Sequence, residues 1–275
     1  MTGGGRALLA AAGLASVLLA GRAVRPRTGS SWTRTNFRGR AVSLSLGVVA
    51  VVALLVGCAL AATAGDDDVR RTAVAMACLA AGAGGVGLYD DQRGNPATKG
   101  LAGHLRALVH GNMTTGALKV VAIAVSAFGA ALVLSRGRID LQVVVDAAVV
   151  AGAANLANLF DLRPGRALKV ILLAAVPIVV AGPAAVGGAL AWPAGVAAGL
   201  LPADLRERGM LGDGGANALG GVVGVAVASA GGLAWSLVAL AVVVAGTLLS
   251  EVVSYSRVIE SVPVLRWADQ LGRAA

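Results

Sequence analysis

The chain has 275 residues, of which 57% are hydrophobic and only 13% are charged. An ordinary soluble domain carries about 25% charged residues, so this composition excludes a soluble globule covered by polar surface. The formal net charge of +9 would suggest a nucleic-acid partner in a soluble protein. Aromatic residues make up only 3% of the chain, however, which leaves few side chains to stack on bases. We therefore expect no nucleic-acid partner and a protein that lies in a membrane.

The apolar residues form near-continuous runs of Ala, Val, Leu and Gly. Each run is about long enough to cross the ~30 Å of bilayer hydrocarbon as a helix, and none shows the alternation of a barrel strand. The fold class predicted is all-α: a polytopic helical membrane protein with one domain over residues 1–275. The nine predicted spans, in chain order, are 7–20, 41–64, 72–88, 116–134, 141–159, 168–183, 186–201, 216–232 and 233–251. Cys58 and Cys78 lie inside these runs, so we interpret them as packing residues.

The distribution of basic residues predicts the orientation, because cytoplasmic loops collect Lys and Arg. The first span resembles a signal sequence, but the arginine-rich flank 22–40 favours a retained anchor with its N-terminus outside. Alternating sides from there assigns 18 of the 23 basic residues to the cytoplasm. The five assigned outside are Arg6, Arg70, Arg71, Arg136 and Arg138. Residues 252–275 mix charged and apolar positions, which predicts an amphipathic tail on the inner membrane surface.

Two adjacent carboxylates, Asp90 and Asp91, end the third span. Carboxylates are costly to desolvate, so these should face water, a cation or each other. Magnesium prefers hard oxygen ligands and substrate phosphates, and a carboxylate pair at a lipid–water boundary suits it. The alternative interpretation is a solvated helix end.

A second polar series, Asn155, Asn158 and Asp161, ends the fifth span. On a helix these residues span an arc of about 120°, so all three can line one cavity. The alternative is that the two amides form hydrogen bonds between helices, as polar side chains in membranes often do.

Two further segments fall on the predicted cytoplasmic side. In 212–220, small residues surround Asp213 and open the eighth span, an arrangement that lets a phosphate approach the backbone, although Asp213 could instead cap the helix. Asn36 and Arg38 belong to a basic stretch before the second span that could bind phosphates or only set topology.

Together these segments resemble the polyprenyl-phosphate N-acetylhexosamine-1-phosphate transferases, the superfamily of the translocase that makes the first lipid intermediate of peptidoglycan. The similarity extends from Asn36 to about residue 221. The matching positions are the paired Asp90 and Asp91, the segment Lys99-Gly100-Leu101, Thr114-Thr115-Gly116 with Lys119, Asn155-x-x-Asn158-x-x-Asp161 with Gly165, and Gly212-Asp213-x-Gly215 with Leu219 and Gly220.

The resemblance implies transfer of a sugar-1-phosphate from a UDP-sugar to polyprenyl phosphate, with release of UMP, in the plasma membrane of a bacterium. It implies Mg²⁺ as cofactor, with Asp213 as a metal ligand and Asp161 as a second ligand or catalytic group. Asp90 and Asp91 would orient or deprotonate the lipid phosphate. The substrate-binding residues implied are Asn155, Asn158, Lys99, Arg38, Asn36 and Lys119. A homodimer or a partner in envelope synthesis would be compatible with this function.

The chain departs from the family pattern in two places. The family's proline- and glycine-rich segment is 42–47 here and lacks the proline, and the family's C-terminal histidine-rich loop has no counterpart, because the only histidines are His104 and His110. A second hypothesis is therefore a non-catalytic relative that binds lipid phosphate or nucleotide and acts as a scaffold in envelope assembly. A transporter is a more distant alternative, since its polar site would be expected near mid-membrane rather than at one face.

Overall fold

A computed structural model describes residues 3–23, 32–93 and 115–273, which form eleven helices and one two-stranded sheet. Nine of these helices coincide with the nine predicted spans. They are α1 (Gly3–Ala23), α2 (Ser45–Ala64), α3 (Asp67–Arg93), α5 (Thr115–Leu134), α6 (Leu141–Phe160), α7 (Arg166–Ala181), α8 (Ala184–Leu205), α9 (Gly212–Ser229) and α10 (Leu233–Val252). The all-α membrane architecture predicted from the apolar runs is confirmed at this level.

Six of the described helices are long and apolar enough to cross a membrane: α2, α3, α5, α6, α8 and α10. On α10, Val238 and Val242 are 60% and 64% exposed, as suits a helix that faces lipid rather than water. α7 is shorter, with 16 residues, and α9 is rich in glycine. The count of nine spans and the side on which each loop lies remain predictions.

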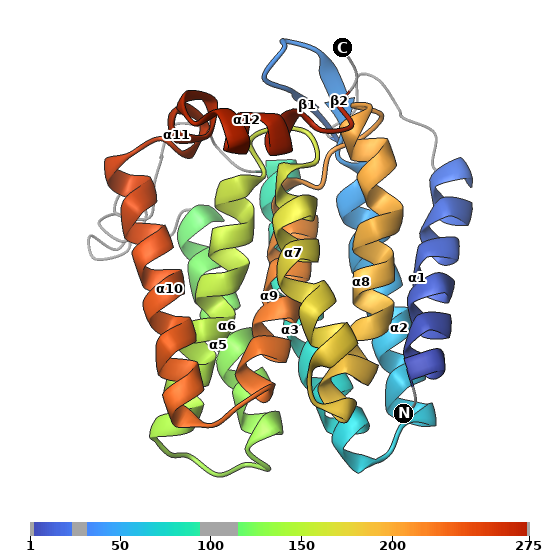
Figure 1. Cartoon of the computed structure of the whole chain (residues 1–275), viewed down its shortest axis with the longest axis vertical. Helices are drawn as coiled ribbons and strands as arrows, with labels where there is room; N and C mark the ends of the chain where they lie inside the picture. The colour runs from blue at the N-terminus through green and yellow to red at the C-terminus, as the bar shows by residue number, and fades with distance from the viewer. Residues whose placement is uncertain (1–2, 24–31, 94–114, 274–275) are drawn as a thin grey trace.

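Successive helices run antiparallel, so the loops alternate between the two ends of the bundle (Figure 1). One end carries the strands β1 (Thr33–Thr35) and β2 (Ala41–Ser43) and the short helices α11 (Tyr255–Ser261) and α12 (Pro263–Gln270) (Figure 1). We call it the hairpin end. At the opposite end Asp68 forms ion pairs with Arg71 and Arg136, two of the basic residues assigned outside.

The β-hairpin corrects the predicted start of the second span. Residues 41–43, assigned to the span, pair instead with 33–35, and α2 begins at Ser45. The turn is held by the Asn36 side chain, whose Oδ1 accepts hydrogen bonds from the backbone N–H groups of Arg38 and Arg40. Gly39 completes the turn at φ 74°, a conformation that glycine adopts without steric cost. These hydrogen bonds stabilise the hairpin, so residues 41–43 form a strand and not the start of the helix.

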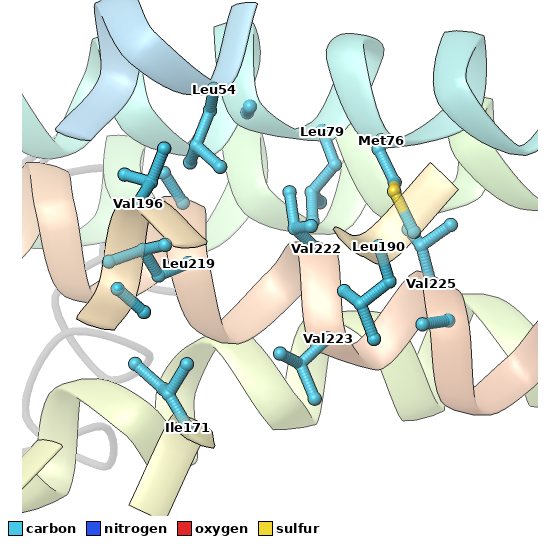
Figure 2. Packing of buried hydrophobic residues seen from close by; sticks show 14 of the residues in the cluster. Leu54, Met76, Leu79, Ile171, Leu190, Val196, Leu219, Val222, Val223 and Val225 are labelled. Atoms are coloured by element: carbon cyan, nitrogen blue, oxygen red, sulfur yellow. The ribbon is translucent and has the colours of Figure 1, made fainter. Parts of the chain in front are cut away.

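α9 is the central helix and packs against α3, α6 and α2. Met76 and Leu79 of α3 and Leu190 of α8 surround Val222 and Val225 of α9 in the buried core (Figure 2). The helices approach closely because small residues lie between them: a Cβ on Gly87 of α3 would lie 2.6 Å from the carbonyl oxygen of Asp213. This contact brings the last turn of α3 against the first turn of α9.

Candidate functional site

The first turn of α9 is held by a carboxylate from α3. Oδ1 of Asp91 accepts a hydrogen bond from the Asp213 backbone N–H, and Oδ2 accepts one from Gly214, both at 3.0 Å. The N-terminal N–H groups of a helix have no partner within the helix and carry positive partial charge, so a carboxylate stabilises them. Asp91 is only 5% exposed. The paired aspartates therefore do not end in water as a solvated helix end would.

Gly212 makes this arrangement possible. Its φ of +60° lies in the left-handed region, and a Cβ there would lie 2.6 Å from Asp91 Oδ2. Glycine alone has neither the backbone strain nor the side-chain clash at this position.

Lys119 of α5 joins the two helices through a pair of ion contacts. Its Nζ lies 2.6 Å from Asp213 Oδ2 and 3.3 Å from Asp90 Oδ2. Asp213 therefore makes its backbone contact to Asp91 and its side-chain contact to Lys119. The structure thus brings together Asp90, Asp91, Lys119 and Asp213, which lie on three different helices.

Asp161 lies beside this group. It ends α6, and it is close enough to Asp204, Asp213 and Asp91 to sense their charges. Burial raises the pKa of Asp161 well above its ordinary value, and those neighbouring carboxylates raise it further. A hydrogen bond from the Gly212 backbone acts in the opposite direction. The site is thus rich in negative charge around Asp161.

Asn36 and Arg38 are brought to the hairpin end but pair with Glu207 rather than with the aspartates. Asn36 Nδ2 donates to Glu207 Oε2 at 2.6 Å, and Arg38 Nε lies 3.3 Å from Oε1. Asn36 and Asp161 nevertheless line the same small pocket, with Asp204 and Glu207 on its other walls. Its free volume of about 20 Å³ is room for little more than one water molecule.

Asn155 and Asn158 are half-buried on α6. Asn155 and Asp161 line different pockets. Asn155 lines an apolar groove of about 300 Å³ between α5, α6 and α10, whereas Asp161 lines the pocket beside Asn36. Asp161 lies just beyond the last residue of α6. Lys99, predicted to bind phosphate, lies outside the described residues.

Several residues of the site were missed from sequence. Arg34 NH2 donates to the carbonyl oxygens of Asp90 and Asp91, at 3.2 and 3.0 Å, and so fixes the hairpin on the end of α3. Asp204 Oδ2 accepts from the Gly165 backbone N–H at 2.8 Å and holds the turn after Asp161. Asn217 is 1% exposed, and its Nδ2 has no hydrogen-bond partner among the described residues. Of these residues, Asn217 could have been recognised from the sequence, because it is a polar side chain close to Asp213 in an otherwise apolar helix.

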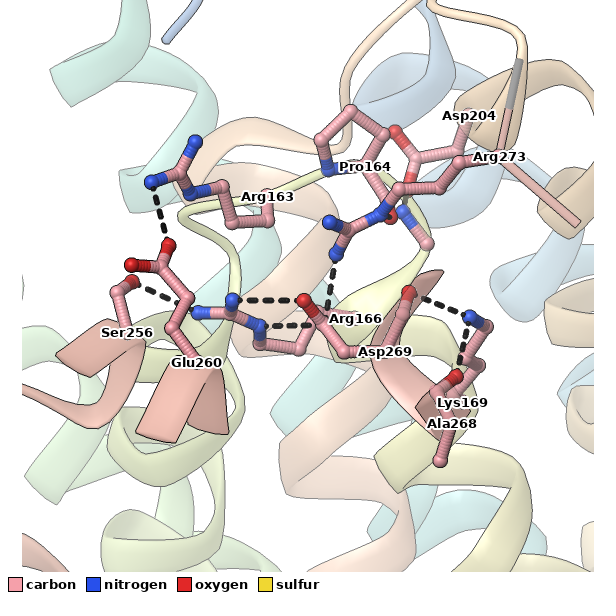
Figure 3. Close-up of polar contacts among 11 residues, drawn as sticks. Arg163, Pro164, Arg166, Lys169, Asp204, Ser256, Glu260, Ala268, Asp269 and Arg273 are labelled. Carbon is pink, nitrogen blue, oxygen red and sulfur yellow. Dashed lines mark hydrogen bonds and ion pairs between the residues drawn. The ribbon is translucent and has the colours of Figure 1, made fainter. Parts of the chain in front are cut away.

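The C-terminal segment covers the turn between α6 and α7 with a charged network (Figure 3). Arg166 of α7 donates to both carboxylate oxygens of Asp269 on α12, at 2.8 and 3.0 Å, and to Ser256 Oγ. Arg273 reaches the same carboxylate and the carbonyl oxygen of Pro164. The predicted amphipathic tail consists of two short helices, α11 and α12, and the polar side of α12 faces the protein. Val264 and Trp267 on its other side are 71% and 65% exposed.

Among the described residues, no group of three or more His, Cys, Asp or Glu side chains converges as a ready metal site. The donor chemistry still fits a hard divalent cation, because the carboxylates of Asp90 and Asp213 meet at Lys119 and the Asp161 carboxylate nearby forms no ion pair within the described ranges.

Neither the models of known protein families nor the curated proteins contain a match to this chain. The function must therefore be argued from the site itself.

Proposed function

We propose that the protein transfers a sugar-1-phosphate from a UDP-sugar to polyprenyl phosphate and releases UMP. The observation that carries the proposal is the meeting of Asp90, Lys119 and Asp213, held by Asp91, at one end of a membrane-type bundle. The site joins negative groups and a basic group, which is a combination suited to holding a divalent cation and phosphates at a membrane surface.

The proposed reaction is a displacement at phosphorus. An oxygen of the lipid phosphate forms a bond to the phosphorus that carries the sugar, and the bond from that phosphorus to the oxygen of UMP breaks. Catalysis of such steps depends mainly on positioning and on electrostatic stabilisation. Lys119 is placed to hold phosphate charge, since its ammonium forms ion pairs with both Asp90 and Asp213. Asp90, whose carboxylate is not committed to the backbone of α9, would orient the lipid phosphate.

Asp91 would have a different role from Asp90. Both of its oxygens already accept backbone hydrogen bonds from Asp213 and Gly214. It would act by positioning α9 through these two hydrogen bonds.

Mg²⁺ would be held by Asp213 with Asp161, and when bound it would offset the charge of the diphosphate. The side chains of Lys119 and Asp90 would then move so that the Asp213 carboxylate contacts the ion as well as Lys119. The negative surroundings of Asp161 support this assignment, since an added cation would relieve the repulsion among carboxylates.

The groove that Asn155 lines would take the prenyl chain. Its other walls are almost wholly apolar and come from α5, α6 and α10. Val120, the residue after Lys119, lies in the wall, so the groove leads from apolar surface toward the charged site. A prenyl chain in the groove would bring its phosphate to Lys119.

The test is a UMP-release assay on purified protein in detergent, with polyprenyl phosphate, Mg²⁺ and a panel of UDP-sugars. We expect lipid-dependent UMP from at least one sugar and a loss of at least about 100-fold in Asp213→Asn. Asp67→Asn is the matched control, because Asp67 is an exposed carboxylate at the opposite end of the bundle. Equal activity of Asp213→Asn and Asp67→Asn would refute the site assignment.

A second function has one observation in its favour: no three acidic groups among the described residues are close enough together to hold a metal ion, and Lys119 pairs with both Asp90 and Asp213. This arrangement suits a non-catalytic relative that binds lipid phosphate or nucleotide as a scaffold. Binding of polyprenyl phosphate that depends on Lys119, with no UMP from any sugar, would favour this function over the transferase.

A further inference from the structure

A further large cavity at the hairpin end lies on the side of the bundle away from the Asn155 groove. It is a cleft of about 490 Å³ between α1, α2 and α8. Figure 1 shows α1 and α8 on one side of the bundle and α10 on the other. We call it the α1–α8 cleft. Nothing in the proposed transfer reaction uses it.

Most of the α1–α8 cleft is lined by apolar side chains, and one end of it is lined by polar side chains. Val17 of α1, Leu46 and Val49 of α2 and Leu200 of α8 line its deeper part. Its residues nearest the hairpin include Ser43, Arg206, Glu207 and Arg208. This division follows the expected depth in a bilayer, with apolar side chains at the level of hydrocarbon and basic ones at the level of headgroups.

A backbone turn at Glu207 explains why Arg206 and Arg208 have no acidic partner among the described residues. Glu207, between them, has a φ of 54°, which is uncommon for a residue other than glycine. Its side chain is 7% exposed and is held by Asn36, Arg38 and Arg40. The backbone turn thus directs Glu207 inward, and neither Arg206 nor Arg208 has an acidic partner among the described residues.

Backbone strain of this kind costs of order 1–3 kcal/mol and persists only where surrounding contacts hold it. Here the contacts with Asn36, Arg38 and Arg40 hold the turn, and these two arginines neutralise the charge of Glu207. The consequence is that the mouth of the α1–α8 cleft carries two arginines without an acidic partner in the described part of the chain, beside a Glu207 that is already paired with other basic groups.

We propose that the α1–α8 cleft binds an anionic membrane phospholipid, with its phosphate at Arg206 and Arg208 and an acyl chain along Val17, Leu46 and Leu200. The arginines match a phosphate in charge and in hydrogen-bonding geometry. The apolar wall matches an acyl chain and excludes a water-soluble phosphate as the preferred ligand. The lipid would be a resident of the protein and distinct from the acceptor of the transfer reaction.

The experiment measures binding of phosphatidylglycerol and phosphatidylcholine to the purified full-length protein in neutral detergent by native mass spectrometry. We expect preference for phosphatidylglycerol, and a loss of affinity on the order of tenfold in Arg206→Gln/Arg208→Gln. The matched control is Arg257→Gln/Arg266→Gln, which removes two exposed arginines from α11 and α12 at the same end of the bundle. The control should bind as the unaltered protein does.

A second variant tests the cleft without changing charge. Ala203 lines the cleft and is only half-buried, so Ala203→Phe should fill the cleft and weaken phosphatidylglycerol binding with both arginines intact. Equal losses in Arg206→Gln/Arg208→Gln and in the control Arg257→Gln/Arg266→Gln would overturn the proposal, and so would no loss in either Arg206→Gln/Arg208→Gln or Ala203→Phe. So would displacement of the lipid by glycerol 3-phosphate, which would show a soluble-phosphate site. Displacement by polyprenyl phosphate with the same arginine dependence would make the cleft an acceptor site and would also overturn it.

Discussion

The Lys119 ammonium on α5 lies 2.6 Å from Asp213 Oδ2 on α9, although 94 residues separate the two along the chain. The same ammonium lies 3.3 Å from Asp90 Oδ2 on α3. Lys119 is therefore the point at which three helices of the site are joined by charge. Its removal would leave two carboxylates facing each other without a cation.

Replacing Lys119 by methionine should both destabilise the protein and abolish transfer. The expected loss in stability is about 2 kcal/mol, less than for a fully buried pair because the Lys119 side chain is 18% exposed. UMP release should fall by at least about 100-fold. Lys119→Arg keeps the charge and should recover most of the stability. Thermal unfolding in detergent and the UMP assay measure the two effects, and a fully active Lys119→Met would contradict the role given to this lysine.

Gly212→Ala should disturb the site more than an alanine at another left-handed glycine. Gly212 has φ +60° and lacks space for a Cβ beside Asp91, whereas Gly137 has φ +80° and no neighbouring atom within 4 Å. Gly137→Ala therefore measures the cost of backbone conformation alone, about 1 kcal/mol. Gly212→Ala should cost about 1 kcal/mol more, because Asp91 must move away from the N-terminus of α9. Equal thermal shifts in the two variants would show that the contact with Asp91 is unimportant.

The docking of α12 should be lost at acidic pH and should not change between about pH 5 and about pH 8. Burial of Asp269 acts to raise its pKa, but the hydrogen bonds and charges of Arg166 and Arg273 outweigh this and hold the pKa below its ordinary value. A carboxylate with a lowered pKa stabilises the docked state above its undocked pKa of about 3.9 and loses that contribution as pH falls through the docked pKa.

A nitroxide spin label at Leu271→Cys, with Cys58 and Cys78 replaced by alanine, would report this docking, since Leu271 is 56% exposed. The label should stay immobile from about pH 8 to about pH 5 and become mobile below about pH 4. In Asp269→Asn it should be mobile throughout. Greater mobility on raising the pH would contradict the assignment of the switch to Asp269.

Ser236→Ala should destabilise the end of the bundle opposite the hairpin. Ser236 Oγ of α10 donates to Asp146 Oδ1 of α6 at 2.6 Å, and Asp146 is only 6% exposed. Without the hydroxyl, Gln142 is the remaining side-chain donor to this carboxylate, so the expected cost is about 1–2 kcal/mol. Ser229→Ala is the matched control, because Ser229 donates only within its own helix, and its cost should stay within about 0.5 kcal/mol. Comparable thermal shifts in both variants would exclude an energetic role for the Asp146 pair.

Helix positions could be predicted because each apolar run must satisfy its own backbone hydrogen bonds. The run 116–134 became α5, Thr115–Leu134, and 141–159 became α6, Leu141–Phe160. Residues 41–43 were assigned wrongly because apolar content does not reveal a turn built on the Asn36 side chain. Such a turn depends on hydrogen bonds between specific atoms rather than on average hydropathy.

The sequence by itself determined the helical class, the positions of the long helices and the residue types that carry charge into an apolar chain. It placed Asp90, Asp91, Asp161 and Asp213 at helix ends, because apolar runs stop where carboxylates would have to be desolvated. Only the tertiary structure decided that Asp91 holds α9, that Lys119 joins Asp90 to Asp213, and that Asn155 and Asp161 belong to different cavities. These pairings depend on how closely helices distant in sequence approach and how they are rotated about their axes, and hydropathy along one chain carries no information on either.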